Sequence, residues 1–250
     1  MKLLVIVLCL LSERFLIHRI SHSRFHWFSS YFTGISQRLP KTEISLFSEI
    51  FILSAVVLPL LLLTWLVLAI LGHWLFGFVG LLLHLVIFYY CLGPENPFYP
   101  VREGEEGEDE VITGNYFAKV NGGLFAVIFW YIAAGPLGVL VYRLISLSRT
   151  QSLTTRLAQM LTDLLDWVPA RLTVLLYLLV GNFQKGIRFW IGMFFASPDK
   201  NYLLLSQGGL LAAKTDEMEV IQMPYAENLV EYALIVYLVF LALFTLVAWL

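Results

Sequence analysis

The segment from Ile50 to Pro94 constrains this chain most, because it contains no Asp, Glu, Lys or Arg over 45 consecutive positions. At about 1.5 Å per helical residue the segment would be about 68 Å long. Two crossings of a hydrocarbon core of about 30 Å need roughly this length, with a turn between them. We therefore predict a helical hairpin in a membrane, with its turn near Leu71-Gly72-His73 and a kink at Pro59 in its first arm.

The composition of the remaining chain also indicates a membrane protein. It is 59% hydrophobic and 14% charged, and uncharged stretches recur at Val120–Tyr142 and Tyr232–Leu250. Unpaired backbone groups are costly in lipid, so each stretch should be helical. The predicted fold class is an all-α polytopic integral membrane bundle over residues 1–250 as a single domain. It has about four long spans, an N-terminal membrane helix and an interfacial amphipathic helix.

The two additional helices are predicted from local patterns. The start, MKLLVIVLCLLSERF, lacks the small-x-small cleavage site of a signal peptide, so we expect a retained helix over residues 2–20. Residues 183–196 follow a helical period that is typical of a helix lying in the membrane interface. The side chains that define its apolar face are Phe183, Ile187, Trp190 and Phe194, with Lys185 and Arg188 elsewhere.

The distribution of Lys and Arg predicts the orientation. Residues 13–49, 95–119 and 184–231 hold eleven of the sixteen Lys and Arg residues and are assigned to the cytoplasmic side. This assignment makes residues 93–119 an acidic cytoplasmic loop and residues 184–224 an interfacial or cytoplasmic segment. A net charge of −2 with scattered basic residues gives no indication of nucleic-acid binding.

Five ionisable residues adjoin the apolar segments: Glu13, Arg14, Asp163, Asp166 and Arg171. A charge at membrane depth costs about 2.5–3.5 kcal/mol on insertion scales, so such residues indicate a paired site. Two interpretations of Arg171 remain open. Either it snorkels to the headgroups beside Trp167, or it belongs to a buried polar cluster between helices. Pro169 either begins the next helix or kinks it.

Other motifs give weaker indications. Gly135-Pro136-Leu137-Gly138 should break the third span, either as a packing kink or as the lining of a site. A transporter has little support, because no inverted repeat is visible. We interpret His18, His22 and His26 as interfacial, and the Glu103–Glu110 run as a solvated loop. No nucleotide-binding, hydrolase or zinc-protease motif occurs, so neither catalytic nor metal-binding residues are predicted.

One string resembles the signature of the CobD/CbiB family of membrane-embedded adenosylcobinamide-phosphate synthases: Leu165-Asp166-Trp167-Val168-Pro169-Ala170-Arg171-Leu172-Thr173. Three more elements occur where that family has its own: Phe129-Trp130, Gly135-Pro136-Leu137-Gly138 and Tyr142-Arg143. The resemblance implies an enzyme that uses ATP to join an amino-alcohol to a corrin side-chain carboxylate.

The short chain, the Glu13-Arg14 pair and the Leu-Asp-Trp-Val-Pro string are more similar to the AmpE branch. Its members are inner-membrane regulatory proteins associated with β-lactamase induction and cell-wall recycling. The chain also departs from the synthase pattern: Ala118–Gly123 replaces an acidic element, one carboxylate of a pair survives as Asp163, and the Asn-Thr-Leu-Asp expected after Arg143 is absent. An ATP-dependent ligase needs such groups around the triphosphate.

The resemblance to the AmpE branch implies a regulator of the bacterial inner membrane, and the departures from the synthase pattern predict that it has no synthase activity and no cofactor. ATP and Mg²⁺ would be needed only by the synthase alternative. The expected partners are the lipid bilayer and components of cell-wall recycling or β-lactamase induction. The surviving polar residues could bind a muropeptide fragment or a nucleotide. This candidate ligand-binding set comprises Glu13, Arg14, Asn121, Tyr142, Arg143, Asp163, Asp166 and Arg171.

Overall fold

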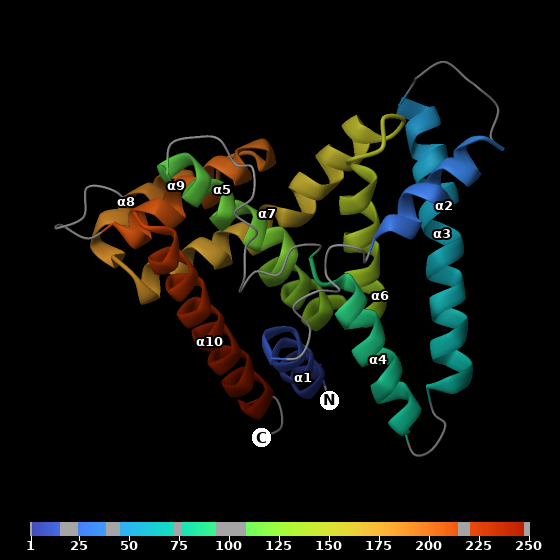
Figure 1. The fold of residues 1–250 in the computed structure, drawn as a ribbon, viewed down its shortest axis with the longest axis horizontal. Coiled ribbons are helices and arrows are strands. Elements are labelled where there is room, and N and C mark those ends of the chain that lie inside the picture. Colours follow the sequence, from blue (N-terminus) through green and yellow to red (C-terminus); the bar gives the residue numbers. More distant parts are fainter. Residues whose placement is uncertain are drawn as a thin grey trace. The chain divides into compact units, whose positions relative to one another are not determined.

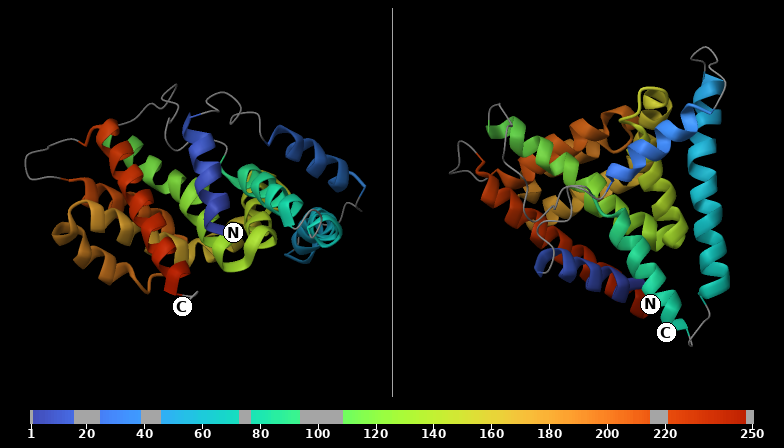
Figure 2. Two further views of the ribbon diagram at one scale, coloured as in Figure 1. Left: turned by 90° about the horizontal axis from the view of Figure 1, so that it is seen from below. Right: turned by 45° about the vertical axis from the view of Figure 1, so that its right-hand side comes forward.

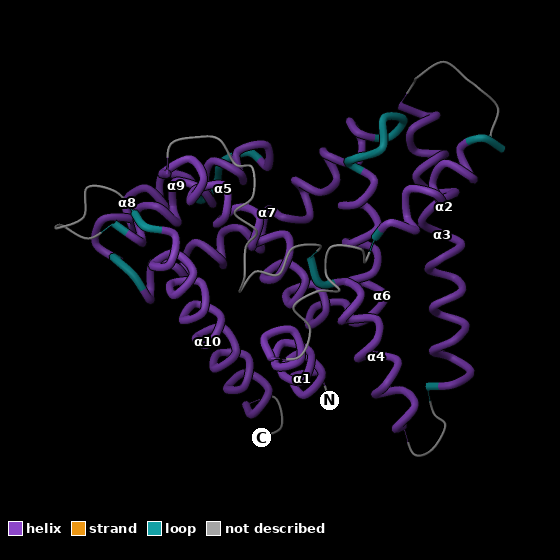
Figure 3. The backbone as a smooth tube through the Cα atoms, viewed as in Figure 1, coloured by secondary structure: helices purple, strands orange, loops and turns teal. Residues whose placement is uncertain are grey.

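A computed structural model describes residues 2–15, 25–38, 46–72, 77–93, 109–214 and 221–247. All regular structure in these ranges is helical, without a strand (Figures 1 and 3). This confirms the all-α class. The chain divides into two compact units, Met1–Pro94 with Val127–Leu165 and Glu95–Ala126 with Asp166–Leu250. The organisation of residues 1–250 as a single domain stays a prediction.

The first unit contains α1 (Lys2–Phe15), α2 (His26–Ser36), α3 (Leu46–Leu71), α4 (Phe78–Cys91), nearly all of α6 (Ala126–Ser148) and the start of α7 (Thr155–Val180). The second unit contains α5 (Asp109–Val120), the π-helix η3 (Asn121–Phe125), the remainder of α7, α8 (Phe183–Met193), the 3₁₀ turn η4 (Pro198–Lys200), α9 (Asn201–Ala213) and α10 (Met223–Val247).

Within the described residues, three helical segments are long and apolar enough to cross a membrane: Leu46–Leu71, Glu110–Ser148 and Met223–Val247. The exposed side chains of these segments are largely apolar. On α3, for example, Leu62 and Trp65 are more than half exposed, and exposing such apolar surface is unfavourable in water but not in lipid. The second arm of the predicted hairpin is the 14-residue helix α4. At about 21 Å, α4 falls short of the hydrocarbon thickness.

The hairpin turn lies where glycine predicted it. Helix α3 ends at Leu71, and the amide of Gly72 donates to the carbonyl of Leu68 at 2.9 Å. Pro59 lies inside α3, which continues as one helix (Figure 2). A proline disturbs the carbonyls one turn before it. Pro59 leaves the carbonyl of Ala55 without a helical donor, and the Tyr31 hydroxyl of α2 donates to the adjacent carbonyl, that of Val56, at 3.0 Å.

Two segments differ from the sequence predictions. The loop predicted over residues 93–119 is helical from Asp109 onward, since α5 and η3 continue into α6. The segment 184–224 contains the largely buried helix α9. Small residues explain this burial, because a Cβ atom at Gly208 or Gly209 would collide with Val174 or Phe117.

Some predictions fall outside the described residues. The N-terminal helix is described only as far as Phe15, so its predicted continuation to residue 20 is not covered. The same holds for His18 and His22 and for residues 94–108, which include most of the acidic run. Pro169 is covered: it lies inside α7, so the interpretation that it begins a new helix is wrong.

Candidate functional site

The guanidinium of Arg171 is the centre of the polar contacts in the second unit. Its Nε donates to the carbonyl of Phe194 at 2.8 Å, and its Nη2 donates to the carbonyl of Ala196 at 2.7 Å. Its Nη1 donates to the carbonyl of Trp167 and to Oδ1 of Asn201, both at 2.7 Å. A guanidinium has five N–H donors, so these four bonds occupy all but one of them.

Two tryptophans complete this arrangement. The Arg171 guanidinium lies 4.3 Å from the centre of the Trp167 ring, within the range of a cation–π interaction. The Trp167 indole donates to the carbonyl of Ala196 at 2.9 Å, and the Trp190 indole donates to the carbonyl of Arg171 at 3.0 Å. Arg171 is only 3% exposed. The structure therefore favours the buried polar cluster over snorkelling to the headgroups.

The contacts of Arg171 stabilise the end of α8. Phe194 is the residue that closes this helix, and Ala196 follows two positions later. Carbonyls at a helix C-terminus have no partner within the helix and carry partial negative charge. The guanidinium satisfies the carbonyl of Phe194 at this end and also that of Ala196, just beyond the helix. The arginine of the family-like string is thus a helix-capping group as well as a candidate ligand-binding residue.

Asn121 lies at the start of the π-helix η3 and faces α7. Its Oδ1 accepts a hydrogen bond from the Thr173 hydroxyl at 2.8 Å, and both side chains are 1% exposed. A π-helix turn often occurs at functional positions because it re-aims side chains. Here it directs a buried amide toward the same helix that carries Arg171. Asp166, also on α7, is partly buried.

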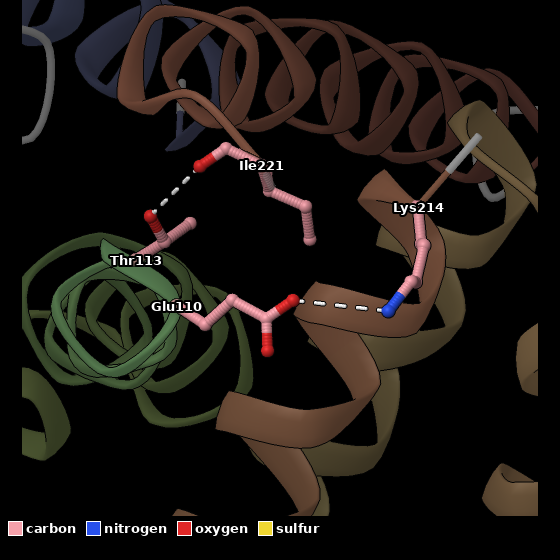
Figure 4. A network of polar contacts seen from close by, with 4 residues as sticks. All are labelled: Glu110, Thr113, Lys214 and Ile221. Atoms are coloured by element: carbon pink, nitrogen blue, oxygen red, sulfur yellow. Dashed lines mark hydrogen bonds and ion pairs between the residues drawn. The ribbon is translucent and has the colours of Figure 1, made fainter. Parts of the chain in front are cut away.

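A separate network holds the ends of α5, α9 and α10 (Figure 4). Lys214 lies 3.7 Å from the Glu110 carboxylate, and the Thr113 hydroxyl donates to the carbonyl of Ile221 at 3.5 Å. Both charged side chains are nearly half exposed, so their ion pair contributes little stability. The network has a connecting role between helices and lies outside the predicted site.

In the first unit, Arg143 performs a capping role that resembles that of Arg171. Its Nε donates to the carbonyl of Cys91, the last residue of α4, at 2.7 Å. Its guanidinium lies 5.7 Å from the Phe25 ring and 6.0 Å from the Tyr142 ring. Arg143 and Tyr142 are 4% and 1% exposed. The predicted Tyr-Arg element is therefore buried within this unit.

The acidic residues of the first unit differ in their surroundings. Glu13 is 1% exposed near the end of α1, and Arg14 beside it is partly buried. Asp163 is partly buried, and one of its oxygens accepts a hydrogen bond from Nε2 of Gln159 at 2.8 Å. Asp163 is thus stabilised by its own helix, one turn away.

Glu49 was not predicted from the sequence. It is 6% exposed in the first turn of α3, and its Oε2 accepts a hydrogen bond from the backbone N–H of Leu157 at 2.9 Å. Leu157 is the third residue of α7, where backbone N–H groups lack helical partners. Glu49 therefore caps α7. The signal for it was an acidic residue immediately before the long uncharged segment.

The predicted break in the third span is confirmed. Gly135 has φ 71° and ψ −161°, a backbone conformation that is accessible almost only to glycine. Pro136 has no N–H for the carbonyl of Ile132, and the Lys2 ammonium of α1 donates to that carbonyl at 2.7 Å. Pro169 likewise leaves the carbonyl of Leu165 without a helical donor, and the Trp130 indole donates to it at 3.3 Å.

A histidine near this break was also missed by the sequence analysis. His84 Nδ1 lies 2.8 Å from the Tyr131 hydroxyl, and the Phe88 ring packs 4.8 Å from the Tyr131 ring. The signal was a polar, titratable residue inside an uncharged apolar segment, which marks a functional candidate by default.

The predicted residues are thus divided between the two units. Glu13, Arg14, Tyr142, Arg143 and Asp163 belong to the first unit, and Asn121, Asp166 and Arg171 belong to the second. Within each unit the structure shows buried, hydrogen-bonded polar groups. A ligand site that uses all eight residues stays a prediction.

Comparison with known proteins gave three findings. Residues 120–250 match the model of the AmpE family, described as regulatory signalling modulator protein AmpE. A cobalamin biosynthesis protein CobD of Stutzerimonas stutzeri (strain A1501) is 33% identical over 95 residues, which cover 34% of this chain and 31% of that protein. The CobD protein of Chromobacterium violaceum is 36% identical over 75 residues, which cover 27% and 24%. The chain thus spans less than a third of these relatives, and no solved structure matches it.

Proposed function

Because the chain belongs to the AmpE family, we propose that it is a membrane-embedded regulator in a bacterial inner membrane. It relays the state of cell-wall recycling to β-lactamase induction and has no synthase activity. The family match covers 131 of the 250 residues, from 120 to 250. The three helices that are long enough to cross a bilayer support its membrane location.

The contacts of Arg171 are the observation that supports a non-catalytic role most strongly. Phosphoryl-transfer enzymes stabilise the developing charge on ATP with free cationic donors and metal ions. Four of the five N–H donors of Arg171 are bonded to acceptors of the protein itself. The most family-like basic residue of the chain is therefore used to fix a helix end rather than to neutralise a triphosphate.

The second candidate function is amide-forming synthesis in cobalamin assembly. The 33% identity to a CobD protein favours it. That match covers less than a third of the CobD protein, so its activity does not extend to this chain by similarity alone.

A paired experiment separates the two candidates. β-Lactamase activity would be measured after exposure to a β-lactam in a strain that lacks this protein, with and without complementation by the full chain. We expect induction to change upon deletion and to be restored by the chain. Purified protein would also be incubated with ATP, an amino-alcohol and a corrinoid acid. ATP-dependent amide formation would reject the regulatory proposal in favour of the synthase.

Asp163 allows a test of the ligand binding that the sequence analysis predicted. Asp163→Asn keeps the size of the side chain and an oxygen that can accept the hydrogen bond from Gln159, so its effect on folding should be small. If Asp163 contributes to binding a polar cell-wall fragment, the variant should shift the β-lactam concentration needed for half-maximal induction. An unchanged induction curve at equal protein abundance would remove Asp163 from the site.

A further inference from the structure

Helix α8 has an inner and an outer side. On the inner side, Gly186 is buried against Leu178 of α7, and the Trp190 indole donates to the carbonyl of Arg171. On the outer side, Ile191 is 61% exposed and Phe195, just after the helix, is 87% exposed. The four outer residues Lys185, Arg188, Ile191 and Phe195 are called the α8 surface below.

The exposed stripe differs from the apolar face that the sequence predicted, because Trp190 of that face lies on the inner side of α8. Phe183 is 42% exposed, whereas Trp190 and Phe194 pack against each other with ring centres 4.9 Å apart. Arg188, Ile191 and Phe195 follow the i, i+3, i+7 spacing of one helical stripe. Apolar and basic side chains therefore adjoin on the exposed side of α8.

The exposure of Phe195 is imposed by its neighbours in the chain. The carbonyl before it, that of Phe194, and the carbonyl after it, that of Ala196, both accept hydrogen bonds from the Arg171 guanidinium. The Trp167 indole adds a second bond to the Ala196 carbonyl. The backbone is thus fixed on both sides of Phe195 while its ring stays almost fully exposed.

The charge of this region indicates what covers it. Residues 183–200 contain three basic residues and one acidic residue. Arg188 is exposed on the stripe that carries Ile191 and Phe195. Exposed aromatic and aliphatic side chains beside cations are typical of helices that lie at the boundary of headgroups and acyl chains. The same chain has helices that are long enough to cross a bilayer, so lipid is the nearest apolar medium.

We propose that the α8 surface binds anionic phospholipid at the membrane interface, with Arg171 as the positioning residue that holds Phe195 outward. The headgroup phosphate is recognised by Arg188 and Lys185, and the Phe195 and Ile191 side chains enter the boundary with the acyl chains. This lipid contact is independent of the proposed regulatory function.

The test uses the full chain in lipid nanodiscs. Phe195→Cys is labelled with a small fluorophore, and quenching is compared between nitroxide-labelled phosphatidylglycerol and nitroxide-labelled phosphatidylcholine. The native Cys9 and Cys91 are buried, so the chain without an introduced cysteine serves as the labelling blank. We expect stronger quenching by the anionic lipid.

Arg188→Gln, made in the labelled chain, tests the recognition of charge. One basic residue near an anionic surface contributes about 1 kcal/mol, so the preference for phosphatidylglycerol should fall about fivefold. Arg156→Gln is the matched control, because it removes an exposed arginine from the start of α7 in the other unit. It should leave the preference unchanged.

Arg171→Lys tests the positioning role, since lysine cannot reproduce the forked set of bonds. The fluorophore at position 195 should then show lower anisotropy, and the lipid preference should fall. If this variant does not fold, Arg188→Gln still decides the lipid proposal. Equal quenching by the two lipids would overturn it. Quenching mainly by aqueous iodide would also overturn it, because the label would then lie in water. A label that neither nitroxide lipid nor iodide quenches would overturn it too, because a second protein would then cover the surface.

Discussion

At the residue scale, this chain uses buried charged side chains to complete helix ends. Arg143 caps α4 and Arg171 caps α8, while Glu49 caps the start of α7. Unpaired helix termini are costly in a low-dielectric environment, and each of these residues satisfies backbone groups that their own helices leave without partners. A substitution that keeps only the charge of such a side chain would therefore not keep its hydrogen bonds to the helix end.

Arg171→Lys should destabilise the second unit strongly. Hydrogen bonds to a charged group contribute about 1.5–3 kcal/mol each, and a lysine ammonium cannot reach four acceptors in the geometry of a guanidinium. We expect a loss of about 3 kcal/mol or more, measured by thermal unfolding of the purified chain in detergent. Arg188→Lys, on the exposed side of α8, should change stability by less than about 0.5 kcal/mol. Equal melting of the two variants would contradict the capping role.

Glu49→Ala should destabilise the first unit by about 1–2 kcal/mol, the usual cost of a lost helix N-cap. The reason is the single bond from its carboxylate to the Leu157 amide, which water does not replace easily at a side chain that is 6% exposed. Glu110→Ala provides the comparison, because its ion pair with Lys214 is nearly half exposed and should contribute less than about 1 kcal/mol. Thermal unfolding in the same detergent measures both.

At the scale of elements, the helices tolerate proline because other parts of the chain supply the missing donors. Lys2 donates to the carbonyl freed by Pro136, and Trp130 donates to the carbonyl freed by Pro169. Trp130 of the Phe129-Trp130 element and Leu165, the first residue of the family-like string, are thus linked by a hydrogen bond within the first unit.

Gly135→Ala should be costly for a reason confined to the backbone. A Cβ atom at this position would meet no atom within 4 Å, so space does not limit the substitution. The conformation does, because φ 71° with ψ −161° is strained by about 1–3 kcal/mol for residues other than glycine. Gly192→Ala is the matched control in open space on α8, where alanine should be neutral or stabilising. Similar unfolding temperatures for both variants would refute the strained break.

The elements that sequence could predict were those with a strong apolar pattern. The uncharged segments predicted α3, the centre of α6 and α10. Glycine residues predicted the turn at Gly72 and the break at Gly135. Helix α9 was missed because its burial depends on close contact at Gly208 and Gly209, which carry no apolar side chain. Glu49 was missed because its partner, the Leu157 amide, is a backbone group 108 residues away. An apolar pattern in the sequence shows which segments prefer lipid or the protein interior. Contacts between residues that are far apart in the sequence, such as Glu49 and Leu157, depend on the tertiary structure.

At the scale of the whole molecule, the described residues form two compact units on one chain, and helices α6 and α7 contribute to both. The family match begins at Val120, the last residue of α5, and runs to residue 250, so it covers Val127–Leu165 of the first unit and most of the second unit. The part of the chain that the match does not describe includes α1 to α4 and all of α5 except Val120. Lys2 and Glu49 from this part nevertheless complete the helices α6 and α7.

The orientation of the chain in the membrane can be tested with cysteines placed at exposed connections. The Lys and Arg distribution assigns residues 13–49 and 184–231 to the cytoplasm and Arg149, Arg156 and Arg171 to the opposite side. The structure contradicts this placement of the three arginines: Glu49 accepts a hydrogen bond from the Leu157 amide at the start of α7, and Arg171 donates to the carbonyl of Phe194. If residues 13–49 and 184–231 are cytoplasmic, Thr150→Cys, in the turn between α6 and α7, and Lys214→Cys, after α9, should therefore react with a membrane-impermeant maleimide only once spheroplasts are permeabilised. Both positions are exposed, and the native cysteines are buried, so the unmodified chain gives the background. Reaction of both sites in intact spheroplasts would invert the assignment and move the α8 surface to the outer leaflet, whereas reaction of only one site would mean that residues 13–49 and 184–231 do not share one side.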